Sequence, residues 1–402
     1  MAIHPTPEGG GSSCQDMINT SNSERYNPAE AEMQKTITEG STLLKVYEKS
    51  FENVSKKTAS VFFNPVMKLN RDITVAVVRS LGDVRFLDLL AATGVKGLRV
   101  AREARAEEVA LNDINSEAIK LIKENAELNT LDVEVYNREA NLLLNETKNR
   151  FNFIDIDPFG TPVPFIDNAI RCVFNKGAVA ITATDTAPLC GVYPKVTIRR
   201  YLARSLRGEL CKETGLRILL GYSARTAAKY DRAISPLLCH STGHYFRCFL
   251  KVVRGAKKAD SSIKNLGYLY FCTKCRNFEV EKSMFPVKRE CCSREMSIAG
   301  PLWLGELKEQ DFVERALKNS HDLSSETKKL LEIIVQEEEI PFYYDIHSLG
   351  SILNLGNLPR MDYIIEQAKK RGYNATRTHI LPTAIKTDLP EKEISDILRS
   401  YG

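Results

Sequence analysis

Apolar and polar residues alternate in blocks along the middle of the chain. Short apolar runs predict seven strands, at residues 85–90, 108–113, 132–136, 151–157, 177–184, 216–223 and 245–253. The segments between the first five runs have helical spacing, as in residues 115–129, where Ile119, Ile122 and Ala126 share one face. Apolar strands that alternate with helices are typical of a parallel sheet covered on both faces. Residues 34–255 are therefore expected to form one doubly wound, Rossmann-like α/β domain, with the last two runs in an edge hairpin or antiparallel return.

The pattern changes towards both ends of the chain. Residues 1–33 are rich in Ser, Asn, Gly and Glu without periodicity, and we expect a flexible tail. After Gly255, the polar segment 256–265 predicts a linker or exposed loop. Helices are expected at about 309–319 and 324–338. Residues 256–402 are interpreted as a second, smaller α+β domain.

Composition narrows the class of protein. The chain has 402 residues, 43% hydrophobic and 27% charged, which is typical of a folded globular protein and excludes bulk disorder. Its 56 Lys and Arg against 51 Asp and Glu give a net charge of +5, which permits a polyanionic partner without requiring one. The first twenty residues have no apolar core of a secretory signal, and no apolar run reaches the length of about 18–20 residues that a membrane helix needs. We expect a cytoplasmic, monomeric protein that does not bind membranes, with its ten cysteines reduced.

A turn of small residues follows the first predicted strand. In LDLLAATGVKGLR, Asp88 lies in the strand, Thr93 and Gly94 lie in the turn, and a helix follows. Asp113 comes nineteen residues after Gly94, at the end of the next strand, where an acidic side chain typically receives a ribose hydroxyl pair. Only Gly94 and Gly97 of a dinucleotide fingerprint are present, which favours a nucleoside cofactor such as S-adenosylmethionine. The alternative is a tight turn with a solvated Asp.

A second loop with candidate chemistry follows the fourth strand, in IDIDPFGTP. Ligands of open α/β sheets bind beyond the carboxyl ends of the strands, where Asp157, Pro158 and Phe159 are expected. A carboxylate and a carbonyl can accept both hydrogens of an exocyclic amine, and Pro158 stiffens the loop. Phe159 can stack on a base that has left its helix. The alternative is an ordinary Pro-containing loop that caps a helix.

Together these segments resemble the family of tRNA guanine-26 N2-dimethyltransferases. The resemblance is carried by FFNPVMKLNRD (62–72), LDLLAATGVKGLR (87–99), LNDI (111–114), IDIDPFGTP (154–162), TATDTAPLCGVYPK (182–195), LRGELCKETGLRILL (206–220), AAKYDRAISPLL (227–238), GPLWLG (300–305) and GYNATRTHI (372–380). It spans about residues 60–380. It implies a Rossmann-like methyltransferase domain at 34–255 and a tRNA-binding domain at 256–402, with S-adenosylmethionine as donor and the guanosine 2-amino group as acceptor of one or two methyl groups.

The resemblance also assigns roles to individual residues. Asp157 would orient the amine and Phe159 would form the stacking wall, with Pro158 between them. The cofactor-binding residues that it implies are Arg71, Asp88, Thr93, Gly94, Arg99, Asp113, Ile114, Glu139 and Ala140. The family usually has Asp where this chain has Glu139. Arg71 could meet the cofactor carboxylate in a bidentate pair, and its alternative is an ion pair with Asp72 or another carboxylate.

Four of the ten cysteines crowd into one segment, at Cys272, Cys275, Cys291 and Cys292. The first two have the C-x₂-C spacing of a zinc knuckle, and four thiolates suit a tetrahedral structural zinc. Neighbouring side chains usually diverge, so one of the adjacent pair could be the ligand without the other. The alternative is a set of free buried cysteines. A catalytic zinc is disfavoured because methyl transfer needs no Lewis acid.

Basic residues gather in two stretches that could bind tRNA phosphates. Lys195, Arg199, Arg200, Arg204 and Arg207 follow Pro194, with the last three predicted on one helical stripe. The second stretch holds Lys369, Lys370, Arg371, Arg377 and His379. The alternative for either is a solvated charged surface.

Three other functions are weighed against the leading one. The first is methylation of another exocyclic amine, such as adenine N6 or a different tRNA guanosine. The second is a zinc-stabilised RNA-binding scaffold without activity. The third, a nicotinamide dehydrogenase, is disfavoured by the missing glycine.

Overall fold

The computed structural model describes residues 33–52 and 59–401. The predicted tail, residues 1–33, lies outside the described residues apart from Met33.

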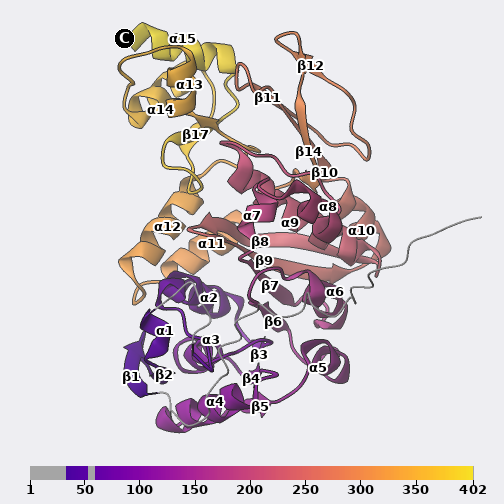
Figure 1. Cartoon of the computed structure of the whole chain (residues 1–402), viewed down its shortest axis with the longest axis vertical. Coiled ribbons are helices and arrows are strands. Elements are labelled where there is room, and N and C mark those ends of the chain that lie inside the picture. Colours follow the sequence, from indigo (N-terminus) through magenta and orange to yellow (C-terminus); the bar gives the residue numbers. More distant parts are fainter. Residues whose placement is uncertain (1–32, 53–58, 402) are drawn as a thin grey trace, which may run out of the picture.

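A seven-stranded sheet forms the centre of the molecule, in the order β5-β4-β3-β6-β7-β9-β8 (Figure 1). Its strands are β3 (Arg85–Asp88), β4 (Glu108–Asn112), β5 (Glu134–Tyr136), β6 (Phe153–Ile156), β7 (Ala178–Ala183), β8 (Arg232–Thr242) and β9 (Tyr245–Arg254). The strands from β3 to β7 are parallel, whereas β9 runs antiparallel between β7 and β8. The chain winds outward in both directions from the β3–β6 pair, so the predicted doubly wound α/β class is confirmed, and this pair is the switch point where such sheets bind ligands.

Helices cover both faces of this sheet. One face carries α2 (Lys68–Leu81), α3 (Val95–Arg99), α4 (Ser116–Leu128), α11 (Gln310–Lys318) and α12 (Ser325–Gln336). The other carries α5 (Ala140–Glu146), α6 (Val163–Cys172) and α9 (Cys211–Ala228). The helices predicted at 309–319 and 324–338 are confirmed as α11 and α12. Each face thus has its own apolar core, as the continuously apolar strands require.

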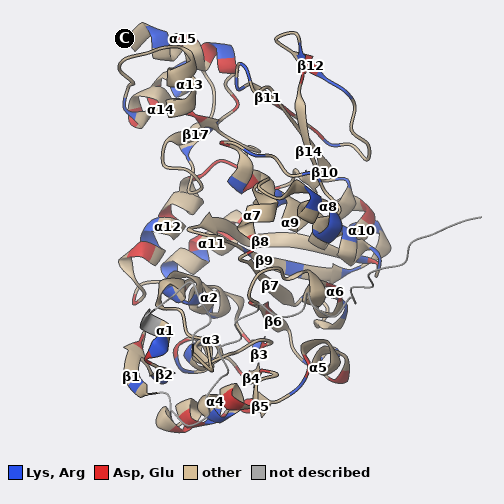
Figure 2. Ribbon diagram, viewed as in Figure 1, with Lys and Arg blue, Asp and Glu red and all other residues tan. Residues whose placement is uncertain are grey.

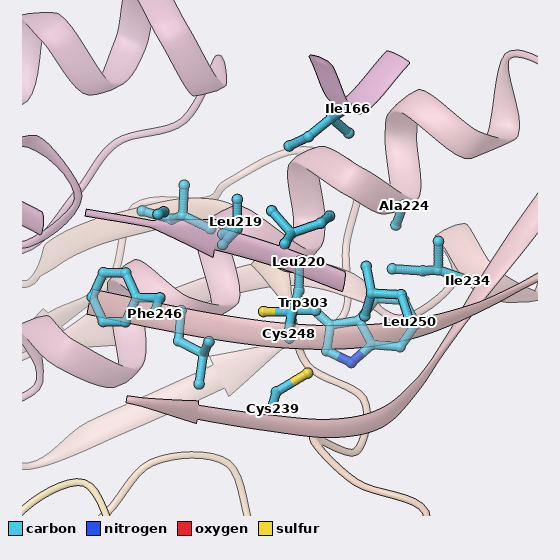
Figure 3. Close-up of a cluster of buried hydrophobic side chains, with 14 of the residues drawn as sticks. Ile166, Leu219, Leu220, Ala224, Ile234, Cys239, Phe246, Cys248, Leu250 and Trp303 are labelled. Atoms are coloured by element: carbon cyan, nitrogen blue, oxygen red, sulfur yellow. The ribbon is translucent and has the colours of Figure 1, made fainter. Parts of the chain in front are cut away.

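The strand predicted at residues 216–223 is wrong, because this segment lies inside α9. The side chains of Leu219, Leu220 and Ala224 cluster with Leu250 of β9 and with Trp303 (Figure 3). A helix buried on several sides is apolar all round, so its sequence cannot be told from that of a buried strand. The seventh strand is β8 instead, and it pairs with β9 in an edge hairpin, so of the two runs expected to form one only 245–253 does so.

The linker predicted at 256–265 is also wrong, since α10 (Ala256–Ile263) forms there. Only Ala259 and Ser262 of this helix are buried, so its polar face dominates the sequence. Beyond it, β10 (Leu266–Phe271), β11 (Phe278–Glu281) and β14 (Ser297–Trp303) form a three-stranded sheet next to α9.

The end of the chain encloses a core of its own. Its elements are β15 (Tyr344–Asp345), β16 (Ala375–Arg377), β17 (Ala384–Thr387), α13 (Ile346–Ile352), α14 (Met361–Lys370) and α15 (Glu391–Tyr401). This group lies at the top of Figure 1, beside a projecting arm that holds β11 and the short pair β12 (Glu290–Cys291) and β13 (Arg294–Glu295). The segment after residue 255 therefore packs partly on the central sheet and partly on itself, and the domain boundary at that residue stays a prediction.

Five short elements complete the surroundings of the sheet. A hairpin of β1 (Gln34–Glu39) and β2 (Thr42–Tyr47) lies against α4, and α1 (Lys49–Glu52) follows it. Asn125 and Asn129 of α4 accept backbone N–H bonds from Lys45 (2.7 Å) and Leu43 (2.9 Å), which fixes the hairpin. Between β7 and α9 the chain forms α7 (Thr186–Leu189) and α8 (Pro194–Tyr201).

Candidate active site

The small-residue turn between β3 and α3 is built as the sequence indicates. Gly94 has a left-handed backbone (φ 80°), and a Cβ there would come within 3.1 Å of Ile122. A Cβ on Gly97 would lie 2.8 Å from Leu111, so this glycine lets the helix approach β4. Asp88 is buried and accepts a hydrogen bond from the Gly97 N–H (3.1 Å), while Thr93 is also buried. Asp88 therefore stabilises the turn through its hydrogen bond to the start of α3.

Asp113 and Glu139 lie at the ends of neighbouring strands, β4 and β5. Asp113 accepts N–H bonds from Ala92 and Asn115, both 2.9 Å long, and Ile114 beside it is 71% exposed. Glu139 caps α5 by accepting from the Asn141 and Leu142 N–H groups (3.0 and 2.8 Å). Ala140 is buried behind it. The structure thus brings Asp113, Ile114 and Glu139 to one rim of the sheet, where a nucleoside could lie.

The two predicted arginines are held in ion pairs. Arg71 forms a bidentate pair with Glu39 (2.6 and 2.5 Å) and also donates to the Asn64 carbonyl. Its partner is thus not its neighbour Asp72, which pairs with Arg99 instead (2.7 Å). Arg99 is fully buried and also contacts Glu39 and Glu103. Arg71 would have to exchange Glu39 for a cofactor carboxylate, and Arg99 has no exposed surface to offer a ligand.

Asp157 projects from the end of β6 with 22% of its side chain exposed. Lys96 Nζ contacts its carboxylate (2.5 Å). Burial alone would raise the pKa of Asp157, but attraction to Lys96 and Arg247 outweighs burial and lowers it. This carboxylate is therefore ionised at neutral pH and free to accept hydrogen bonds from an amine.

Phe159 is the most exposed part of the loop, at 60%. Its ring meets the ring of Phe62 edge-on, with 4.4 Å between centroids and 78° between planes. Gly160 follows with a left-handed backbone (φ 81°) and bonds to Thr184 at the end of β7 through its N–H (2.7 Å) and its carbonyl (3.0 Å). The loop thus presents an aromatic ring beside the Asp157 carboxylate and is fixed from behind.

Three charged residues beneath this loop were missed by the sequence analysis. Asp155 of β6 is fully buried, between Lys96 Nζ (2.9 Å) and the Arg247 guanidinium of β9 (3.1 Å). Burial and the neighbouring carboxylates of Asp155 and Asp157 raise the pKa of Asp88 to about 7, although Lys96 opposes them. The sequence did indicate that Asp155 has a partner, because a buried Asp inside an apolar strand must pair with a cation. The identity of that cation could not be read from the sequence.

A further polar group was also missed near this cluster. Tyr245 begins β9 and is 6% exposed, yet its hydroxyl has no hydrogen-bond partner among the described residues. Burial raises its pKa, with Arg247, Asp157 and Arg71 as its charged neighbours. His240 of β8 lies against its ring (5.8 Å between centroids). Tyr245 is therefore a protonated donor close to the candidate site.

The first basic stretch is exposed, and Figure 2 shows its cations gathered at α8. It comprises Lys195, Arg199, Arg200, Arg204 and Arg207. The predicted helical stripe is wrong, because α8 ends at Tyr201 and Leu202 is left-handed (φ 49°), which puts Arg204 and Arg207 in the following loop. Arg200 pairs with Asp185 (3.1 Å). The other four form no ion pair with any residue of the described ranges and can meet phosphates.

The second basic stretch is largely neutralised by local carboxylates. Arg377 pairs with Asp362 (2.9 Å), Lys370 with Glu366 (2.7 Å) and Arg371 with Glu393 (3.5 Å). The expectation that His379 lies on this surface is wrong, since its side chain is 2% exposed and contacts Glu337 (2.5 Å). Arg377 keeps 49% of its side chain exposed, so its role with RNA stays a prediction.

The four clustered cysteines converge in the arm beyond β10. Their sulfur atoms all lie within 4.8 Å of one another, and the Cys275 and Cys291 sulfurs are 3.5 Å apart. Cys292 and the next residue both have left-handed backbones (φ 53° and 59°), which turns the adjacent side chains to one side. Because a zinc–sulfur bond is about 2.3 Å long, four sulfurs at this spacing fit a tetrahedral ion. Both adjacent cysteines, and not one alone, are thus placed to bind.

The other cysteines form no such group in the part of the chain that the structure describes. Among residues 33–52 and 59–401, no helix combines the length and the apolar character that crossing a membrane requires.

This chain is similar to known proteins along most of its length. The family model described as N2,N2-dimethylguanosine tRNA methyltransferase matches residues 40–399. A tRNA (guanine(26)-N(2))-dimethyltransferase of Thermococcus kodakarensis is 44% identical over 362 residues, 85% of this chain and 94% of the relative. The same-named protein of Methanothermobacter thermautotrophicus is 38% identical over 376 residues, 90% and 98% of the two chains. Among solved structures, a complex of Trm1 from Pyrococcus horikoshii with S-adenosyl-L-methionine aligns with a TM-score of 0.82 and 40% identity, over 90% of this chain and 99% of that one.

Proposed function

Because this chain belongs to the N2,N2-dimethylguanosine tRNA methyltransferase family, we propose that it methylates the exocyclic N2 of guanosine 26 in tRNA once and then a second time. It is an S-adenosylmethionine-dependent tRNA guanine N2-methyltransferase. The observation that carries the proposed mechanism is the partly exposed Asp157 carboxylate, in contact with Lys96, in the same loop as the exposed ring of Phe159 at the switch point of the sheet.

The rim of the sheet supplies the residues that would hold the cofactor. Asp113 would receive the ribose hydroxyls and Ile114 would cover the adenine, with Glu139 at the neighbouring strand end. The turn at Gly94 would let the cofactor lie close to the backbone. Arg71 would bind the carboxylate after leaving Glu39. When bound, S-adenosylmethionine supplies an electrophilic methyl group on a sulfonium.

Asp157 then has a defined task in the transfer. Its carboxylate accepts a hydrogen bond from the guanosine 2-amino group and turns the nitrogen lone pair towards the methyl carbon. Attack of that nitrogen on the methyl group would build positive charge on the amine, while the electron pair of the broken carbon–sulfur bond would stay with the sulfur. The ionised carboxylate stabilises that charge and accepts the departing proton. One N–H remains after the first transfer, so the second can use the same contact.

Phe159 would hold the base from its face. A flipped guanine loses stacking inside the tRNA, and an exposed aromatic ring can replace that stacking. Phe62, which touches the Phe159 ring, extends the apolar surface at the same place. The exposed cations Lys195, Arg199, Arg204 and Arg207 would bind the tRNA backbone close to α8.

The cysteine cluster is proposed as a structural zinc site. Cys272, Cys275, Cys291 and Cys292 would complete the coordination shell with thiolates alone, which leaves no open position for chemistry. A closed site of this kind stabilises the arm beyond β10. A monomeric state and a cytoplasmic location stay predictions.

The competing functions are not favoured. The curated relatives that match along the chain carry guanosine-26 dimethyltransferase names, which speaks against adenine N6 and against an inactive scaffold.

Methylation of a tRNA transcript with radiolabelled S-adenosylmethionine, followed by nucleoside analysis, tests the proposal. We expect label in N2-methylated guanosine, and none with a transcript that has adenosine in place of guanosine 26. Asp157→Ala should bind S-adenosylhomocysteine like the wild type but lose turnover by about 10²-fold or more, whereas the matched control Asp167→Ala on α6 should stay active. Label in N6-methyladenosine, or full turnover by Asp157→Ala, would contradict the proposal.

A further inference from the structure

A chain of hydroxyl groups ties the loop after Asp157 to α8. The Thr161 hydroxyl lies 2.9 Å from the Tyr201 hydroxyl. Tyr201 in turn donates to the Asp185 carboxylate, with oxygen–oxygen distances of 2.8 and 3.0 Å. A phenol has one hydrogen, so Thr161 must donate to Tyr201 while Tyr201 donates to Asp185. The sequence separations are 40 and 16 residues, so the chain of bonds exists only in the folded protein.

The backbone reinforces this connection at the neighbouring residue. The Gly160 carbonyl accepts N–H bonds from Thr184 (3.0 Å) and Asp185 (3.3 Å), and the Gly160 N–H donates to the Thr184 hydroxyl (2.7 Å). Gly160 and Thr161 directly follow Phe159. The end of the loop is thus held by its backbone to β7 and by its side chain to α8.

Tyr201 is itself rigidly placed. It is fully buried at the end of α8, and its carbonyl accepts a hydrogen bond from Arg225 of α9 (2.7 Å). Its ring meets the ring of Tyr222 edge-on, with 5.8 Å between centroids. The end of α8, the Arg225 guanidinium and the Tyr222 ring thus hold the Tyr201 phenol in one place, so it can keep Thr161 in a fixed position.

Asp185 adds an electrostatic reason to expect a function. Its side chain is 6% exposed, and burial raises its pKa although Tyr201 and Arg200 oppose the rise. A buried carboxylate costs free energy unless it is bonded on every side. Arg200 supplies the remaining partner from α8 (3.1 Å) and keeps 42% of its own side chain exposed. The helix that presents cations to the tRNA backbone therefore also holds the loop that would orient the base.

We propose that Tyr201 is a positioning residue for methyl transfer, which sets the loop of Asp157 and Phe159 relative to tRNA bound at α8, through Thr161 and Asp185. This inference rests on the proposed function. Because Tyr201 is fully buried, it would touch neither substrate nor cofactor, and we expect it to act on the rate of transfer while both affinities stay in place.

Tyr201→Phe removes one oxygen and keeps the ring in its buried site. Because displacement of reacting groups by about 1 Å costs about 10²-fold, we expect the single-turnover rate to fall about 10- to 100-fold while the Kd values for tRNA and S-adenosylhomocysteine change less than about twofold. The control is Tyr343→Phe, since Tyr343 is equally buried and donates to the Glu209 carbonyl (2.7 Å) outside this chain of bonds. Tyr343→Phe should keep the wild-type rate.

Thr161 provides a second route to the same answer if Tyr201→Phe does not fold. Thr161→Val removes the hydroxyl and keeps the shape, and should slow transfer like Tyr201→Phe, whereas Thr161→Ser keeps the hydroxyl and should restore the rate. The double variant of Thr161→Val and Tyr201→Phe should be no slower than either single one, because both break one chain of bonds.

The outcomes separate this inference from the proposed function. Wild-type rates in Tyr201→Phe or Thr161→Val, or a loss equal to that of Tyr343→Phe, would overturn the role of Tyr201. Loss of tRNA affinity that accounts for the whole effect would also overturn it. If the wild-type chain does not methylate guanosine 26, or Asp157→Ala stays active, the proposed function fails first.

Discussion

Lys96 is the residue on which the charge of the candidate site depends most. Its side chain is 6% exposed, and its ammonium lies 2.9 Å from Asp155 and 2.5 Å from Asp157. With Asp88 beneath the turn, three carboxylates share this region with two cations, Lys96 and Arg247. Replacing Lys96 by Met would leave three carboxylates facing Arg247 alone.

The distances give the size of the effect. At an effective dielectric constant of about 20, a unit charge pair at these separations is worth about 6 kcal/mol before desolvation is subtracted. Removing one partner of a buried pair usually destabilises a protein by about 3–5 kcal/mol, and we expect Lys96→Met to lose that much unfolding free energy. Loss of the Lys96 charge also raises the pKa of Asp157, because less electrostatic attraction then opposes the effect of burial.

The pKa of Asp157 determines how methylation depends on pH in the wild type and in Lys96→Met. In the wild type the lowered pKa of Asp157 keeps the carboxylate charged across the neutral range, so we expect methylation to fall only as acid protonates it. In Lys96→Met the acidic limb of the rate profile should move to higher pH, and the rate should recover in mildly alkaline buffer. Lys96→Arg keeps the charge and should keep the wild-type profile.

Single-turnover methylation across the pH range, with chemical unfolding of the same samples, measures both effects. Lys45→Met is the matched control, because it removes a half-exposed pair with Glu124 on the same side of the molecule. An unchanged acidic limb and unchanged unfolding free energy in Lys96→Met would show that Lys96 does not hold Asp157 in its charged form.

Three further predictions concern the surface, the arm and the C-terminal contacts. Arg199→Ala and Arg207→Ala should weaken binding of every tRNA alike and lower the slope of log Kd against log salt by about one each, whereas the exposed Lys120→Ala should not, as filter binding would reveal. The purified protein should carry about one zinc per chain by elemental analysis and lose it in Cys291→Ser; a metal-free wild type would contradict the site. Glu337→Gln should cost about 3–5 kcal/mol of unfolding free energy, because it removes the carboxylate that the buried His379 and Lys386 share and leaves Lys386 with Glu213 (3.4 Å). Since the pKa of Glu337 is lowered, its contribution is present at neutral pH and lost in acid, and the variant should therefore lose less stability on acidification.

The parallel part of the fold could be predicted because its strands obey a simple rule. A strand buried on both faces is apolar along most of its length, and β3, β4, β6 and β7 all fall inside predicted runs. α9 follows the same rule for another reason, since it is enclosed between the central sheet and β14. Gly221 lets it approach, as a Cβ there would lie 3.1 Å from Leu302. Composition alone cannot distinguish these two kinds of burial.

The candidate site also contains some residues that could be predicted from the sequence and others that could not. Asp113 and Asp157 could be found because each follows a strand, and the carboxyl ends of parallel strands meet at one edge. Arg247 could not, because it reaches Asp155 from an antiparallel strand 92 residues later in the chain. The convergence of Cys291 and Cys292 was equally hidden, since it depends on left-handed backbone at positions without glycine.

The buried cations explain how Asp157 could work once a base covers it. A carboxylate kept charged by water alone would see its pKa rise as an arriving guanine removed that water, and it would tend to take up a proton when it is needed. Lys96 and Arg247 are both buried, so an arriving base would not displace them. Their attraction strengthens as water leaves, because the local dielectric constant falls. A base could therefore cover the site while the Asp157 carboxylate stays ionised and able to stabilise the positive charge on the amine.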